Sequence, residues 1–197
     1  MKFEGKECEM RSLALTVMTV FVLGCSLTQP GENPNQDGDA LNKFSGDSLA
    51  PMHLVMETRD TTGVAVSSFE EGEDIIIVGR LYNLTPDTVR LQLPDPRPFV
   101  EFNVWSGDSL VGNSLDGLAF IQIPSEVKVP PESGIKHAYS WLSTNQHQPL
   151  SPGEYLVNPE MQVASWAPSP SEVALDSLTF TVRSSEKEKE PADSRLQ

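Results

Sequence analysis

Side chains that can act as nucleophiles, general acids or metal ligands are sparse in this sequence. The three histidines are His53, His137 and His147, and none stands at metal-ligand spacing from another histidine or an acidic residue. The sequence contains no Gly-x-Ser-x-Gly, no His-Glu-x-x-His and no phosphate-binding loop. This pattern predicts a non-catalytic protein that needs no metal and no cofactor.

The thiol of Cys25 has a more distinctive setting. It follows an apolar run of 11 residues, Leu13 to Leu23, which is too short to span a membrane because a spanning helix needs about 20 residues. Val22-Leu23-Gly24-Cys25 resembles the bacterial lipobox, in which the thiol is diacylated and the chain is cut before the cysteine. We therefore expect a signal peptide over 1–24 and a lipid anchor at Cys25. The alternative is an ordinary signal peptide with an incidental cysteine.

The flanks of this run refine the expectation. Three acids, Glu4, Glu7 and Glu9, suit the start of a signal peptide poorly, so Met10 is a candidate for the true first residue. Ser26 stands where an Asp often retains a lipoprotein in the inner membrane, which favours the outer membrane if the cell is Gram-negative. The predicted location is the bacterial cell envelope, with the protein held on a membrane by its lipid.

Charge and cysteine content exclude several classes of partner and of structure. The net charge is −14, so nucleic-acid phosphates and anionic lipid headgroups are repelled. The two cysteines, Cys8 and Cys25, both lie near the N-terminus. Disulfides and thiolate metal sites are therefore excluded for the rest of the chain.

Composition divides the remainder into three parts. Residues 25–48 are rich in Pro, Gly, Asn and Asp, which predicts a flexible tether. Residues 184–197 are charged and low in complexity, which predicts a disordered tail. Between them, 49–183 carries about nine short β patterns separated by Pro and Gly turns, including 117–123 and 135–142. These predict an all-β, immunoglobulin-like antiparallel β-sandwich.

Alternation along the strands predicts which side chains face the core. The inward sets are Val89, Leu91 and Leu93; then Val100, Phe102 and Val104; and finally Leu178, Phe180 and Val182. In Pro152-Gly153-Glu154-Tyr155 we expect the tyrosine to cap its turn, like the tyrosine corner of such sandwiches.

Four motifs over 73–165 resemble the BsuPI domain, a family named for an intracellular proteinase inhibitor. They are the turn Asn83 to Thr85, the strand and turn Phe102 to Asp108, the segment from Pro131-Glu132-Ser133 to Trp141, and the turn Pro152 to Tyr155. The family's usual Gly-Gln before the Phe strand is replaced here by the Pro-rich 93–99. The resemblance implies a sandwich fold and raises the possibility of proteinase inhibition.

The Pro-rich stretch 93–99 is the predicted binding loop, with Pro94, Pro96, Arg97 and Pro98 as its candidate residues. Prolines stiffen a loop and lower the entropic cost of binding. An Arg-Pro bond is also one that a protease does not readily cut, so Arg97 is a candidate contact with a protease. The alternative is a Pro turn between strands that carries a solvated arginine.

Two modification patterns also occur. Five triplets join Asp to a hydroxyl residue and then to an apolar residue or Thr, as in the O-glycosylation acceptor that some Gram-negative bacteria use; their hydroxyls belong to Ser48, Thr61, Thr88, Ser109 and Ser177. The alternative is that Asp-Ser and Asp-Thr pairs simply form turns. Asn83-Leu84-Thr85 is a formal N-glycosylation sequon that we expect to be silent in a bacterial lipoprotein.

Three functional hypotheses follow. The favoured one is a membrane-tethered, non-catalytic domain that binds a protein or another macromolecule at the envelope, through loops such as 93–99 and 143–151. The second is a proteinase inhibitor of BsuPI type that acts in the periplasm or at the cell surface. The third, an enzyme, is disfavoured because the catalytic motifs above are missing.

Overall fold

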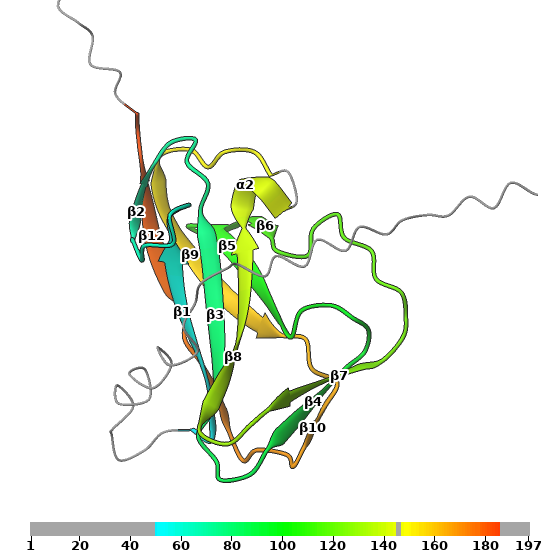
Figure 1. Ribbon diagram of the computed structural model, residues 1–197. Helices are drawn as coiled ribbons and strands as arrows, with labels where there is room; N and C mark the ends of the chain where they lie inside the picture. The colour runs from blue at the N-terminus through cyan, green and yellow to red at the C-terminus, as the bar shows by residue number, and fades with distance from the viewer. Residues whose placement is uncertain (1–49, 145–146, 186–197) are drawn as a thin grey trace, which may run out of the picture. The chain divides into compact units, whose positions relative to one another are not determined.

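The computed structural model describes residues 50–144 and 147–185, and they form an all-β, immunoglobulin-like sandwich (Figure 1). The elements are β1 (Met52–Arg59), β2 (Ser68–Glu70), β3 (Ile76–Asn83), β4 (Val89–Leu93), β5 (Val100–Ser106), β6 (Ser109–Asn113), β7 (Ser125–Val129), β8 (Ser133–Ser140), α2 (Trp141–Thr144), β9 (Gly153–Met161), β10 (Ser165–Ala167), β11 (Val173–Leu175) and β12 (Leu178–Arg183). The predicted signal peptide 1–24, the tether 25–48 and residues 186–197 of the predicted tail lie outside the described residues.

Three sheets build the sandwich. One layer has the order β11-β1-β3-β8, and the facing layer has the order β2-β12-β9-β5-β6. A smaller sheet, β10-β4-β7, lies at one end (Figure 1). The predicted inward residues of β4 and β5 are buried, with Val100, Phe102 and Val104 at 0% exposure. In β12, Phe180 and Val182 are buried and Leu178 packs against the same core.

Phe102 joins the two large sheets at their centre. Its ring stacks on His137 of β8, with centroids 5.6 Å apart and an interplanar angle of 16°. The ring also lies over Gly79 of β3, where an added Cβ would come within 3.0 Å of it. A Cβ at position 79 would be tight against this ring and would require it to shift, which explains a glycine inside a buried strand.

The predicted tyrosine corner is confirmed. The hydroxyl of Tyr155, on β9, donates a hydrogen bond of 2.7 Å to the carbonyl of Ser151, four residues earlier. The Tyr155 ring stacks on Phe180 of β12 with centroids 5.3 Å apart. The tyrosine thus fixes the chain's entry into β9 and fills the core between neighbouring strands.

The side chain of Asn83 is buried and hydrogen-bonded, so its N-glycosylation sequon is inaccessible. The side chain is fully buried, and its amide nitrogen donates to the carbonyls of Asp87, Val129 and Pro130. Its amide oxygen accepts from the backbone N–H and the hydroxyl of Thr85. An amide with all these bonds inside the fold is not available for glycosylation, because modification would leave several buried polar groups unsatisfied.

The structure differs from the sequence interpretation in three places. The described residues contain twelve strands rather than about nine, and two pairings, β1 with β11 and β2 with β12, are parallel. Residues 117–123 form no strand. The 135–142 strand ends at Ser140, because Trp141–Thr144 turns into α2. The short strand β11 was missed because a three-residue strand shows almost no alternation.

His137 gives the fold a testable pH dependence. Burial lowers its pKa to about 4 from the ordinary 6.5. Between these values the unfolded chain takes up a proton that the folded protein does not, so the free energy of unfolding falls as the pH drops from about 6.5 to about 4. The full loss is on the order of 3 kcal/mol. His137→Phe, which keeps the stacking on Phe102, should remove most of it.

Urea unfolding of the wild type and of His137→Phe, at about pH 7 and about pH 4.5, measures the difference. Other groups titrate in the same interval, but they do so in both proteins, so the comparison isolates His137. Equal decreases in the two proteins would show that His137 does not titrate as the geometry requires.

Candidate binding surface

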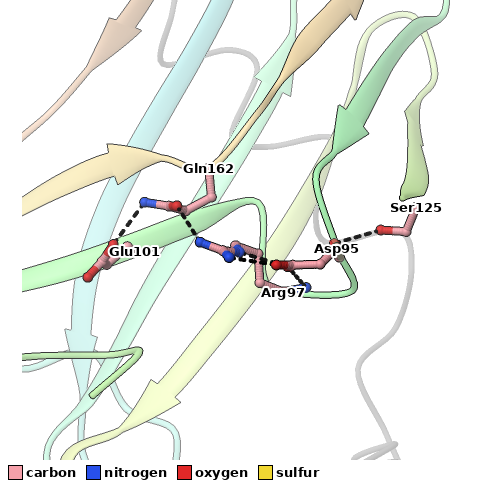
Figure 2. Close-up of polar contacts among 5 residues, drawn as sticks. All are labelled: Asp95, Arg97, Glu101, Ser125 and Gln162. Atoms are coloured by element: carbon pink, nitrogen blue, oxygen red, sulfur yellow. Dashed lines mark hydrogen bonds and ion pairs between the residues drawn. The ribbon is translucent and has the colours of Figure 1, made fainter. Parts of the chain in front are cut away.

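The predicted binding loop is tied down by an internal ion pair. We call residues 94–98, between β4 and β5, the proline loop. The carboxylate of Asp95 accepts hydrogen bonds from the backbone N–H, Nε and Nη2 of Arg97, at 3.1, 2.7 and 2.6 Å (Figure 2). Asp95 is 4% exposed, whereas Pro94 and Pro96 face solvent. The loop therefore presents its prolines and turns its acid inward.

Arg97 connects this loop to the strands beside it. Its Nη1 donates to Oε1 of Gln162 at 3.2 Å, and Nε2 of Gln162 donates to Oε2 of Glu101 at 2.8 Å (Figure 2). The hydrogen bonds from Arg97 hold the pKa of Asp95 below its usual range. The guanidinium is thus engaged within the protein, although the Arg97 side chain remains 28% exposed.

A second loop contacts the proline loop. We call residues 115–124, between β6 and β7, the aliphatic loop. The Arg97 guanidinium carbon lies 5.4 Å from the centroid of the Phe120 ring, a cation–π contact. At the loop's far end, the hydroxyl of Ser125 donates to the carbonyl of Asp95 at 3.0 Å (Figure 2). Both contacts fix the aliphatic loop against the proline loop.

The start of the aliphatic loop is fixed by its own side chains. Asp116 accepts from the backbone N–H and the side-chain amide of Asn113, at 2.8 and 2.9 Å. The Asn113 side chain accepts in turn from the backbone N–H of Leu115 at 2.8 Å. Gly117 then turns the chain with φ of 72°, a left-handed conformation that glycine adopts without strain. The loop is therefore held at both ends and in the middle.

This loop exposes aliphatic side chains that no core contact accounts for. Leu118, Ile121 and Ile123 have exposed fractions of 43%, 65% and 60%. Leu110 and Val111 of the preceding strand β6 are exposed as well. Single exposed apolar residues are ordinary, but several on one short ordered segment indicate an interaction surface.

Sequence reasoning missed this surface because 117–123 has the composition of a buried strand. Apolar residues in that stretch predict a strand only if a partner strand and a core lie beside it. Here β6 ends at Asn113 and β7 begins at Ser125, so the intervening residues have neither. The signals that point to a loop are Gly117 and Pro124, which bracket the stretch.

The remaining candidate residues do not gather into one site. His53 pairs with Asp176 at 3.0 Å, and His147 stacks on Trp141 at 4.2 Å between centroids. Within 50–144 and 147–185, no group of three His, Cys, Asp or Glu side chains is arranged to hold a metal ion. No helix in the described part is long and apolar enough to cross a membrane. Cys25 lies outside the described residues.

Two other predictions have a structural outcome. The triplet hydroxyl residues Thr61, Thr88, Ser109 and Ser177 are all exposed, while Ser48 lies outside the described residues. In the predicted binding loop 143–151, Leu150 is 6% exposed and Trp141 donates to the carbonyl of Gln148 at 3.0 Å. Leu150 thus anchors this segment on the core, while Ser143, Gln148, Pro149 and Ser151 are exposed; residues 145 and 146 are not described.

Removing the Arg97 side chain should loosen both loops together. In Arg97→Ala, the amides of residues 95 and 97 and of 118–123 should exchange with solvent roughly tenfold faster, because the contact between the two loops is gone, while β1 and β3 stay unchanged. Arg90→Ala, an exposed arginine on β4, is the matched control. Amide hydrogen exchange read by mass spectrometry measures both.

Acid should weaken the same tie in the wild type. Because Arg97 lowers the pKa of Asp95, the contact is complete above the ordinary aspartate range and is lost as the pH falls through the lowered value.

An aliphatic loop that exchanges at the same rate in Arg97→Ala and in wild type would contradict the coupling between the two loops.

Comparison with known proteins adds little to this geometry. No family model matches the chain, and a search of curated proteins finds no match. A β-glucosidase from Listeria innocua is 10% identical with a TM-score of 0.35 over 70% of this chain, which spans 17% of the enzyme. The CARDB domain of a Pyrococcus furiosus protein, in complex with di-metal ions, is 12% identical with a TM-score of 0.35 over 70% of this chain and 98% of the domain. The C-terminal domain of wzt is 13% identical with a TM-score of 0.35, covering 68% and 74%. Likenesses this weak carry no information on activity.

Proposed function

We propose that this protein is a non-catalytic binding domain, lipid-anchored through Cys25 in the bacterial envelope, that holds a protein partner on the surface formed by the proline and aliphatic loops. The observation that supports the binding surface is a set of exposed aliphatic side chains on a loop fixed at three places. The support for the anchor is the sequence Val22-Leu23-Gly24-Cys25.

Rigidity is what makes this surface suited to binding. Ordering a flexible loop on binding costs free energy, and the ion pair of Asp95 with Arg97 and the contact with Phe120 have already met that cost in folding. Fully burying an Ile or Leu contributes about 1.5–3 kcal/mol. Leu118, Ile121 and Ile123 are only 43–65% exposed, so each contributes roughly half of that, and the three together support a specific complex.

Proteinase inhibition remains the alternative, supported by the BsuPI resemblance and the stiff proline loop. An inhibitor that works by offering Arg97 to a protease pocket would have to break the bonds of that side chain to Asp95 and Gln162. The geometry therefore favours a contact made by the aliphatic side chains. Inhibition that is unaffected by Arg97→Ala would exclude the arginine from an inhibitory mechanism.

The anchor has a direct test. Replacing Cys25 with serine removes the thiol that would carry the acyl chains, so the protein should move from the membrane fraction to the soluble fraction of its cells. Immunoblotting of fractionated cells measures the distribution, with Ser26→Ala as the neighbouring control. A Cys25→Ser protein that stays with the membranes would show that the lipobox interpretation is wrong.

The binding surface is tested by capture with defined variants. Full-length protein purified from the envelope should retain a protein partner, and Ile121→Ser with Ile123→Ser should lose it, because two of the buried anchors become polar. Val64→Ser removes an equally exposed aliphatic side chain, 58% exposed, from the turn after β1 and should have no effect.

The identity of a retained protein separates the two functions. A protease as the stoichiometric partner would place the inhibitor hypothesis first. Retention that is equal in the Ile121→Ser, Ile123→Ser protein and in Val64→Ser would contradict the proposed surface, and turnover of a co-purifying substrate would contradict a non-catalytic role.

A further inference from the structure

Negative charge gathers beside the candidate binding surface, where Arg97 offsets it only in part. Glu101 of β5 and Glu160 of β9 stand directly opposite each other on neighbouring strands. Glu101 lies next to Phe102, which faces the core, so its side chain is on the outer face of the sheet. Two acids in such a position repel each other, and this costs the fold stability.

A third carboxylate reinforces the first two. Burial, Glu160 and Asp116 together raise the pKa of Glu101, so the negative charges act on one another across β5, β9 and the start of the aliphatic loop. Arg97 is close to Glu101, but its guanidinium already forms the ion pair with Asp95. Arg97 therefore offsets only part of the repulsion, and the pKa of Glu101 remains raised.

The charges and the aliphatic side chains adjoin. Asp116 is two residues from the exposed Leu118 in the same loop. Glu101 is connected to the same loop by three contacts in series. It accepts a hydrogen bond from Gln162, Gln162 accepts one from Arg97, and Arg97 contacts the Phe120 ring. These contacts place a carboxylate beside the loop that carries Ile121 and Ile123.

We propose that the partner's contact segment is a cationic, amphipathic polypeptide, with apolar side chains that cover Leu118, Ile121 and Ile123 and with lysine or arginine side chains that meet Glu101, Asp116 and Glu160. This rests on the proposed function and names the chemistry of its partner. Opposite charges at the border speed association and select the partner, while the apolar contact supplies most of the affinity.

Two other occupants of the surface are disfavoured by the same charges. A membrane with anionic lipids would be repelled by the three carboxylates and by the net charge of −14. A second copy of the chain would bring the same acids against each other, because a two-fold contact pairs the same surface with itself. A cationic polypeptide converts this repulsion into attraction.

The test uses two synthetic peptides of twelve residues with leucines in identical positions. In one peptide all remaining residues are lysine, and in the other they are all glutamate. Fluorescence anisotropy measures their binding to the full-length protein in detergent. The lysine peptide should bind and the glutamate peptide should not. Ile121→Ser with Ile123→Ser should weaken binding roughly tenfold, and Val64→Ser should leave it unchanged.

Charge is tested with a pair of double variants of equal net charge. Glu101→Gln with Glu160→Gln should weaken binding of the lysine peptide roughly three- to tenfold and reduce its sensitivity to salt. It should also leave the fold at least as stable, because a repulsion is removed. Glu71→Gln with Glu172→Gln, two exposed glutamates outside this surface, should change neither.

Each contrary result has a definite meaning. Equal binding of both peptides, or an equal effect of the two glutamate pairs, would overturn the cationic partner. So would protection of amides 118–124 in protein reconstituted into phosphatidylcholine and phosphatidylglycerol vesicles without peptide, or a self-association that Ile121→Ser abolishes. An envelope protein retained through Ile121 and Ile123 but insensitive to Glu101→Gln with Glu160→Gln would leave the proposed function standing and remove only this inference. Wild-type protein that retains no partner and binds neither peptide would remove both proposals.

Discussion

The packing of Phe102 between the two large sheets is the constraint on which the rest of the structure depends. The ring fits only because Gly79 has no side chain and because His137 offers a flat face. The same residue also holds the origin of the aliphatic loop. Its N–H donates to the hydroxyl of Ser114 at 2.9 Å, and its carbonyl accepts from the N–H of Ser114 at 3.0 Å. The core therefore sets the position from which the loop departs.

Electrostatic contacts, rather than burial of apolar side chains, fix the conformation of the proline and aliphatic loops. Asp95 and Arg97 form a bidentate charged pair, the strongest class of side-chain hydrogen bond, and Arg97 supports Phe120. Polar contacts beneath the loops leave the aliphatic side chains free to face outward. A loop that relied on its own apolar residues for order would have to bury them and would have none to offer a partner.

The acidic character of the chain opposes self-association through its exposed aliphatic groups. Ile121 and Ile123 would promote self-association on a neutral protein, whereas carboxylates at the border repel a second copy. The facing pair Glu101 and Glu160 brings two like charges together on neighbouring strands, which costs the sheet stability. Such a cost is expected where a residue serves an interaction rather than stability.

The sequence by itself determined the features that depend on neighbouring residues. Alternation showed the buried faces of β4 and β5, and the turn Pro152 to Tyr155 predicted the bond from Tyr155 to Ser151. The lipobox-like motif at Cys25 is also local, and its lipidation stays a prediction. These succeed because strand periodicity and turn chemistry act over a few residues.

Tertiary structure alone decided what lies against each element. It placed β2 beside β12 in the facing sheet rather than beside β1, and it left 117–123 without a partner strand. It also brought Gln162 to Arg97, and Glu160 to Glu101, from distant parts of the chain. Periodicity states that a residue faces one side, but it carries no information on which distant segment covers that side. The candidate surface consists of such long-range contacts, which is why the sequence named Arg97 and its prolines yet missed the aliphatic loop.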